Sequence, residues 1–232
     1  MCGRFVSTAG STELETLFTA QPSEEYLAPS YNVAPSTNVY GVIGVPGSVN
    51  RKIEVFRWGF TSPVKGKGSG STLLINARVE TVDLKPRFAA SFEYRRCLVP
   101  ADGFFEWGGG SRRAGRQPSY IYKQDQTSMA LAGIWEPSRA DGGPHDRPSL
   151  VILTRESDGL MSGIHDRMPV TLHSSLWSRW LDTDCDNAGA LKRSIAEAPI
   201  ETLKAHYVDA QIGNPRRDQP ENIAAVQVNT LW

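Results

Sequence analysis

The chain has 232 residues, and its 25 basic and 25 acidic side chains leave a formal net charge of zero. This balance excludes a protein that binds nucleic acid through bulk positive charge alone, although it leaves room for a local basic patch. Three cysteines without regular spacing exclude a disulfide framework and a cysteine metal cluster. Because no signal peptide and no apolar run of membrane-spanning length is found, we expect a soluble protein of the cytoplasm.

Apolar patterns predict a mixture of helices and strands. The first helix has Thr12 and Glu15 at the spacing of a capping box, the reciprocal hydrogen-bond pattern that starts many helices. In chain order, we expect a helix over 11–20, strands over 38–45 and 52–60, a helix over 84–96, strands over 97–101, 103–107, 118–124, 128–136 and 149–156, and helices over 174–181 and 187–198.

Stretches rich in glycine, serine and proline separate these elements at 63–71, 108–116 and 137–148. None is long enough to require a domain boundary. Strands that follow one another directly favour antiparallel pairing, because parallel neighbours need a long crossover connection. We therefore expect an α+β fold with one domain over 1–232. Its core would be a mostly antiparallel, curved or barrel-like β-sheet with peripheral helices, and we expect a monomer.

The first residue that could take part in a reaction is Cys2, in the sequence MCGRF at the start of the chain. One interpretation is a small buried residue, since free cysteine is often buried. The other follows from removal of Met1, which leaves an α-amine of pKa about 7.7–8.0 beside a thiol. That amine would condense with an aldehyde to a Schiff base, and the tethered thiol would then close a five-membered thiazolidine ring.

Three further stretches place polar residues within or beside predicted strands. Glu106 in GFFEW is either an outward carboxylate or a carboxyl among aromatic rings with a raised pKa suited to proton transfer. His165 in GIHDRMP is either a structural hydrogen bonder or a catalytic group on a loop. Asn76 in INARVE is either a residue of the reactive site or the cap of a following helix. Arg78 could pair with Glu80 or meet a phosphate.

The remaining candidates receive less weight. His145 lies in a Gly/Pro-rich stretch, and His173 and His206 carry no pattern. Cys97 is expected to be a buried strand residue and Cys185 a surface thiol. We expect no metal and no cofactor.

Taken together, the motifs MCGRF, YNVAPS, WGF, NARVET, RRCLVPADGFFEW and HDRMPV closely resemble those of the SOS response-associated peptidase family, the abasic-site processing proteins. The resemblance runs from residue 1 to near the C-terminus. It implies a protein that recognises abasic sites in single-stranded DNA, whose ring-opened sugar is an aldehyde. It also implies a covalent thiazolidine crosslink to Cys2 after Met1 is lost, with abasic-site lyase and autoproteolytic activities as further possibilities.

The resemblance also implies roles for individual residues. Cys2 would be the crosslinking nucleophile, Asn76 would position its amine or the sugar, Glu106 would shuttle protons, and His165 would act on the sugar hydroxyl or the imine. Arg4 and Arg78 would clamp flanking phosphates. Covalent capture needs few phosphate contacts, which agrees with the neutral net charge. Trp58 and Trp107 are candidates for stacking on bases, with core packing as the alternative.

Two other functions fit parts of the pattern. Class II glutamine amidotransferases also begin with Met, Cys and Gly, and use the N-terminal cysteine to attack an amide. The Arg and Phe that follow in MCGRF, and the lack of a synthase-like domain, argue against an N-terminal-nucleophile amidohydrolase. A non-covalent single-stranded DNA-binding module, with an incidental Cys2, is the other alternative.

Overall fold

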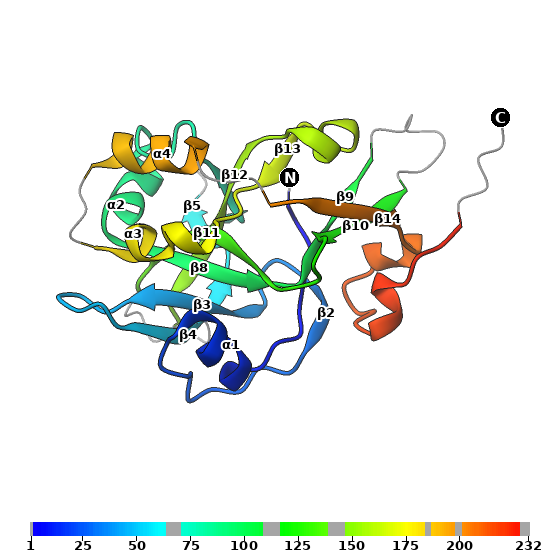
Figure 1. Ribbon diagram of the computed structural model, residues 1–232, viewed down its shortest axis with the longest axis horizontal. Coiled ribbons are helices and arrows are strands. Elements are labelled where there is room, and N and C mark those ends of the chain that lie inside the picture. The colour runs from blue at the N-terminus through cyan, green and yellow to red at the C-terminus, as the bar shows by residue number, and fades with distance from the viewer. Residues whose placement is uncertain are drawn as a thin grey trace.

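The computed structural model describes residues 2–63, 71–108, 117–138, 147–183, 187–197 and 201–227. Their strands form a seven-stranded sheet, a five-stranded sheet and a two-stranded sheet (Figure 1). The strands are β1 (Phe5–Ser7), β2 (Ser30–Val33), β3 (Asn38–Gly44), β4 (Arg51–Trp58), β5 (Phe60–Pro63), β6 (Ser71–Leu74), β7 (Asn76–Arg78), β8 (Arg96–Ala101), β9 (Gly103–Trp107), β10 (Pro118–Lys123), β11 (Met129–Glu136), β12 (Ser149–Glu156), β13 (Arg167–Pro169) and β14 (Leu203–Tyr207). The helices are α1 (Ser11–Phe18), α2 (Pro86–Tyr94), α3 (Trp177–Leu181) and α4 (Ala188–Glu197), with 3-10 turns η1 (Gly159–Gly163), η2 (Ser174–Leu176), η3 (Ala210–Gly213) and η4 (Pro220–Ile223).

The seven-stranded sheet curves into a ring. Its strands follow the order β11-β8-β3-β4-β12-β13, and β12 pairs back onto β11. The pairings are antiparallel except where β12 runs parallel to β4 and to β7. This arrangement confirms the predicted α+β class and the mostly antiparallel, curved sheet.

Strand β12 shows why the ring is stable. Its residues Leu150, Val151, Ile152 and Leu153 are all fully buried, as expected for a strand that is covered on both faces. Val151 and Leu153 face one apolar cluster, whereas Leu150 and Ile152 face another. The ring therefore has a packed core on each side.

The helices cover one of these two faces. Buried residues of all four α-helices, among them Phe18, Phe92, Trp180 and Leu191, belong to the first cluster. Figure 1 shows α2, α3 and α4 gathered at one end of the molecule. The second cluster lies on the opposite face of the ring and includes Cys2.

The five-stranded sheet packs on that second face. Its order is β14-β10-β9-β1-β2, so the N-terminal strand β1 lies between β9 and β2 (Figure 1). Phe5 pairs with Phe104, and both belong to the cluster that contains Cys2. The N-terminus is therefore held inside a sheet, against the usual tendency of chain ends to fray.

One local prediction, the capping box, was wrong, and one alternative, the helix cap at Asn76, is excluded. Helix α1 begins at Ser11 with Gly10 as its N-cap, so Thr12 lies inside the helix and no side chain caps it. The Ser11 hydroxyl instead accepts a hydrogen bond from the Ser23 backbone at 2.7 Å. Asn76 does not cap a helix, because residues 76–78 extend the parallel ladder on β12.

Most other elements occur near their predicted positions. The helix predicted over 174–181 is divided into η2 and α3, and the helix predicted over 187–198 is α4. The predicted loops at 63–71, 108–116 and 137–148 fall largely outside the described residues, as do His145 and Cys185. Among the described residues, no helix has both the length and the apolar character required to cross a membrane.

Candidate active site

Cys2 lies shortly before β1, separated from it by Gly3 and Arg4, in an apolar environment. The residue is fully buried and shares its cluster with Phe104 of β9, Ile152 of β12 and Met168 of β13. The backbone carbonyl of Arg4 also accepts a hydrogen bond from Phe105 N at 2.9 Å, which fixes the chain next to Cys2. Three segments distant in sequence thus contribute to the cluster that contains Cys2.

These surroundings determine the protonation state of the thiol. Burial raises the pKa of the Cys2 thiol far above its usual range, and the negative charge of Glu106 raises it further. A hydrogen bond from the Arg4 backbone lowers the pKa, but by less. At neutral pH Cys2 is therefore a neutral thiol rather than a thiolate.

Asn76 contacts the backbone of Cys2 directly. It lies on β7 opposite Ile152, and its Nδ2 donates a hydrogen bond to the Cys2 carbonyl at 2.9 Å. Its Oδ1 is buried and has no hydrogen-bond partner among the residues that the structure describes. Because an unpaired buried acceptor is costly, this oxygen is a position where a donor would be stabilised.

Glu106 is a buried carboxyl on the Cys2 side of β9. The residue is 3% exposed, which rules out the outward carboxylate that the sequence left open. Alternation along β9 places it on the face of Phe104, which packs in the Cys2 cluster. Its influence on the pKa of Cys2 agrees with this position.

His165 lies on the short connection between η1 and β13. Its Nδ1 accepts a hydrogen bond from the Arg167 backbone at 3.0 Å, and Asp166 Oδ1 lies 2.7 Å from the same nitrogen. Both contacts cannot be favourable in one protonation state, because a neutral Nδ1 accepts and a protonated Nδ1 donates. The Arg167 contact is fixed by the backbone, whereas the Asp166 side chain is 85% exposed and can turn to solvent, so we assign Nδ1 as the acceptor of the Arg167 N–H.

His165 is linked to the cluster that contains Cys2 through residues near it in the chain. Ile164, the preceding residue, packs against that cluster, and Met161 and Met168 on either side belong to it. All four stretches singled out in the sequence therefore meet around one apolar cluster.

The two candidate phosphate-binding arginines differ in their environment. Arg78 is exposed and lies two residues after Asn76, so alternation along β7 places both on one face. Arg4 already donates hydrogen bonds to Asn32 Oδ1 at 2.8 Å, Ile212 O at 3.1 Å and Gly213 O at 3.2 Å. Its side chain therefore ties β1 to the C-terminal turns, and a phosphate contact from Arg4 stays a prediction.

The two tryptophans proposed to stack on bases lie in different environments. Trp58 is fully buried and its Nε1 donates to the Ile75 carbonyl at 3.0 Å, so it packs in the core and the predicted stacking role is wrong for it. Trp107 is partly exposed but packs with Phe105, on the face of β9 opposite Glu106. A stacking role for Trp107 stays a prediction.

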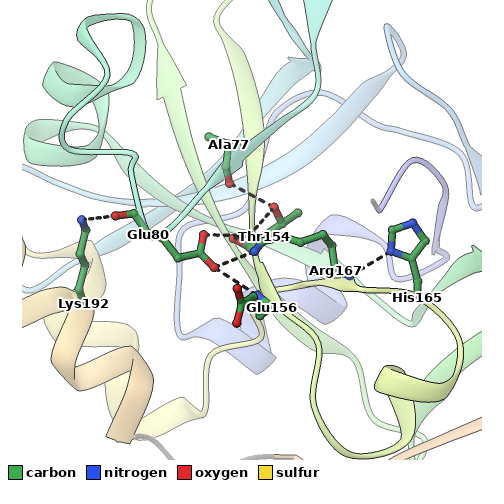
Figure 2. Close-up of polar contacts among 7 residues, drawn as sticks. All are labelled: Ala77, Glu80, Thr154, Glu156, His165, Arg167 and Lys192. Carbon is green, nitrogen blue, oxygen red and sulfur yellow. Dashed lines mark hydrogen bonds and ion pairs between the residues drawn. The ribbon is translucent and has the colours of Figure 1, made fainter.

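Glu80 pairs with a residue that was not expected from the sequence. Its carboxylate accepts two hydrogen bonds from Arg167, at 2.8 and 2.9 Å, rather than pairing with Arg78 (Figure 2). The available signal for this pair was the opposite charge of Glu80 in NARVE and Arg167 in HDRMP, two motifs that were assigned to the same site. Across the described residues, no group of three or more His, Cys, Asp and Glu side chains is arranged to hold a metal ion.

Comparison with known proteins identifies the family. Residues 1–215 match the family model described as SOS response associated peptidase (SRAP). The abasic site processing protein YoqW of Bacillus subtilis is 32% identical over 227 residues, which cover 96% of this chain and 99% of YoqW. The abasic site processing protein YedK of Escherichia coli is 26% identical over 232 residues, 97% of this chain and 100% of YedK.

The fold agrees with this assignment. A crystal structure of a Bacteroides thetaiotaomicron protein superposes with a TM-score of 0.76 at 22% identity, covering 97% of this chain and 100% of that chain. The family match spans most of the sequence and includes all four stretches that contribute to, or pack against, the cluster that contains Cys2. The chain therefore belongs to the SOS response associated peptidase family.

Proposed function

We propose that this protein processes abasic sites in single-stranded DNA by forming a covalent thiazolidine between Cys2 and the ring-opened sugar. The observation that carries the proposal is the contact of Asn76 with the Cys2 backbone, beside the buried carboxyl of Glu106. The names of the relatives YoqW and YedK support abasic sites as the substrate.

The chemistry requires removal of Met1, which frees the α-amine of Cys2. This amine attacks the sugar aldehyde, and loss of one water gives an imine. The thiol sulfur then bonds to the former aldehyde carbon while its proton passes to the imine nitrogen, which closes the ring. The elevated pKa of the buried thiol favours this order, because a neutral thiol leaves the first attack to the amine.

Asn76 and Glu106 would assist different steps. The unpartnered Oδ1 of Asn76 would accept a hydrogen bond from the free amine and orient its lone pair toward the aldehyde. Glu106 would take the proton released as the amine adds, and return it to the departing hydroxyl. His165 would act on the sugar hydroxyl or the imine from the η1–β13 connection.

The same imine would give a lyase activity. A Schiff base at the sugar withdraws electrons from the neighbouring carbon, so that loss of a proton there breaks the bond to the 3′ phosphate. Closure of the thiazolidine removes the imine and therefore suppresses this cleavage. We accordingly expect crosslinking to dominate as long as the thiol is present.

The decisive test mixes the untagged protein with a single-stranded oligonucleotide that carries one abasic site, followed by a denaturing gel. The matched control has one extra residue between Met1 and Cys2, which keeps the thiol but converts its amine into an amide. A shifted band that disappears in this control supports the proposal, whereas a shift in both proteins, or in neither, contradicts it.

A Cys2→Ser variant separates the two steps. It keeps an N-terminal amine but lacks the thiol, so we expect no stable crosslink and increased strand cleavage. Borohydride should trap its imine as a denaturation-resistant band. The family description names a peptidase activity, which in this chain would also require Cys2. The amidohydrolase alternative would be favoured by a different result, in which the protein forms no crosslink but releases ammonia from glutamine.

A further inference from the structure

We infer that Glu80 and Arg167 are positioning residues that hold His165 in the tautomer with its proton on Nε2 and fix its ring relative to β7. This inference rests on the proposed function for its effect on crosslinking, although the tautomer itself is a property of the protein without DNA.

The first step is the geometry of the ion pair. Arg167 Nη1 and Nη2 each donate to one oxygen of Glu80, at 2.8 and 2.9 Å, in the two-point arrangement that gives such pairs their directionality (Figure 2). The Arg167 side chain is 10% exposed and that of Glu80 is 41% exposed. The arginine is therefore largely desolvated, and the carboxylate is its main counter-charge.

The second step is that the pair spans three strands. β7 and β13 flank β12 on opposite sides, with Thr154 paired to both Arg78 and Pro169. Arg167 Nη2 also donates to the Thr154 carbonyl at 2.7 Å, so the side chain crosses the end of β12 to reach Glu80 (Figure 2). The Asn76 strand and the His165 connection are consequently linked through one guanidinium.

Glu80 is itself fixed by the surrounding backbone. Its Oε1 accepts a hydrogen bond from Glu156 N at 3.2 Å, and its backbone carbonyl accepts from Lys192 Nζ at 3.1 Å. Although burial raises the pKa of Glu80, hydrogen bonds from Arg167 and the Glu156 backbone lower it, and the net effect is a pKa below the usual range. Glu80 is thus a carboxylate throughout the neutral range.

The backbone of Arg167 connects the ion pair to the imidazole of His165. The backbone N–H of Arg167 points at Nδ1 of His165 at 3.0 Å, which in the neutral ring assigns the proton to Nε2. The backbone around this N–H is held by the ladder with β12, where Glu156 pairs with Arg167 and Ser157 N donates to Asp166 O at 3.0 Å, and the ion pair with Glu80 anchors the side chain at the same end of that ladder. Loss of the ion pair would release the β13 start and allow the Nδ1–H tautomer to pair with Asp166.

The test compares Glu80→Gln and Glu80→Ala with the wild type by nitrogen-15 NMR of the histidine rings, without DNA. The His165 signals are assigned from their loss in His165→Gln. We expect the Nε2–H tautomer to dominate in the wild type, to persist partly in Glu80→Gln, and to give way to a mixture in Glu80→Ala. An unchanged tautomer in Glu80→Ala would overturn the inference.

A matched control comes from a second bidentate pair in the same molecule. Arg87 donates to both oxygens of Glu136 at 2.7 and 2.8 Å, and Glu136→Ala removes that pair. We expect about a tenfold lower crosslinking rate at saturating DNA for Glu80→Ala, an unchanged half-saturating DNA concentration, and partial recovery in Glu80→Gln. An equal loss in Glu136→Ala would assign the effect to general stability and overturn the inference.

The two proposals fail in different ways. If the wild type forms no crosslink, the proposed function fails, and the NMR comparison still decides whether Glu80 and Arg167 set the tautomer. If the wild type crosslinks and the tautomer does not respond to Glu80→Ala, the proposed function stands and the positioning role is rejected.

Discussion

The side-chain amide of Asn76 and the backbone carbonyl of Cys2 are joined by a hydrogen bond of 2.9 Å between residues 74 positions apart. The contact uses only half of the amide, since Oδ1 is buried without a partner. Buried acceptors in folded proteins are rarely left unpaired, so a donor placed beside this oxygen would be stabilised. A free amine on Cys2 is the donor that the proposed chemistry would provide.

Replacing Asn76 by Ala should therefore slow crosslinking. The variant loses both the support of the Cys2 carbonyl and the acceptor for the amine. One hydrogen bond of about 1–1.5 kcal/mol corresponds to roughly a tenfold lower rate. The single-turnover rate on abasic DNA measures the effect, and Asn38→Ala, at an exposed position of β3, is the control. A rate equal to that of the wild type would show that Asn76 only supports the backbone.

Glu106→Gln tests proton transfer with little change of shape. Because the residue is buried and the amide cannot accept a proton at neutral pH, we expect the crosslinking rate to fall by roughly 10²–10⁴, the usual contribution of general acid–base catalysis. DNA affinity, measured by fluorescence anisotropy, should be unchanged.

The control for this substitution is Glu24→Gln, at an exposed carboxylate distant in sequence. Equal rates for the two variants would argue against proton transfer by Glu106. A loss of affinity in Glu106→Gln without a loss of rate would instead point to a binding role.

Much of this arrangement could be predicted from the sequence, because local patterns determine it. The buried run in β12 and the alternation in β9 give the fold class and the strands that carry Glu106. The burial of Glu106 itself was left open, since alternation alone does not say which face of a strand meets the core.

The features that the sequence missed depend on contacts between distant segments. Asn76 was compatible with a helix cap, and only the ladder on β12 makes it a strand residue. The burial of Trp58 depends on how the ring and the five-stranded sheet pack together. The Glu80–Arg167 pair joins residues 87 positions apart, a distance that charge patterns along the chain do not reveal.

Arg78 should contribute to DNA binding through charge alone. Its side chain is exposed, on the same face of β7 as Asn76, and a phosphate contact would release about 0.7 counterions from single-stranded DNA. We expect Arg78→Ala to weaken binding of abasic and intact oligonucleotides alike, and to reduce the slope of log affinity against log salt by about that amount.

Trp58→Phe is the contrasting variant. Because Trp58 is buried and bonds to the Ile75 carbonyl, this change should lower stability by about 1–3 kcal/mol and leave the salt dependence unaltered. A lower salt slope in Trp58→Phe, or none in Arg78→Ala, would reverse these two assignments.

Alkaline pH should destabilise the fold through its buried thiols. Burial raises the pKa of Cys2 and of Cys97 far above the usual range, and burial followed by the charge of Asp102 raises the pKa of Tyr120. The unfolded chain releases its thiol protons above about pH 8.5, whereas the folded chain keeps them. The folded state then binds more protons, so stability is unaffected below that pH and falls by about 1.4 kcal/mol per pH unit for each thiol above it.

Urea unfolding under reducing conditions at pH 7, 9 and 10 measures this slope. Cys97→Ala removes one of the two described thiols, both of which are buried and free, and it keeps the Cys2 thiol. The variant is expected to be less stable at pH 7, because it loses a buried side chain, but to lose less additional stability as the pH rises. Parallel curves for the wild type and Cys97→Ala would mean that the Cys97 proton is not retained on folding, and that the destabilisation at high pH comes from other groups.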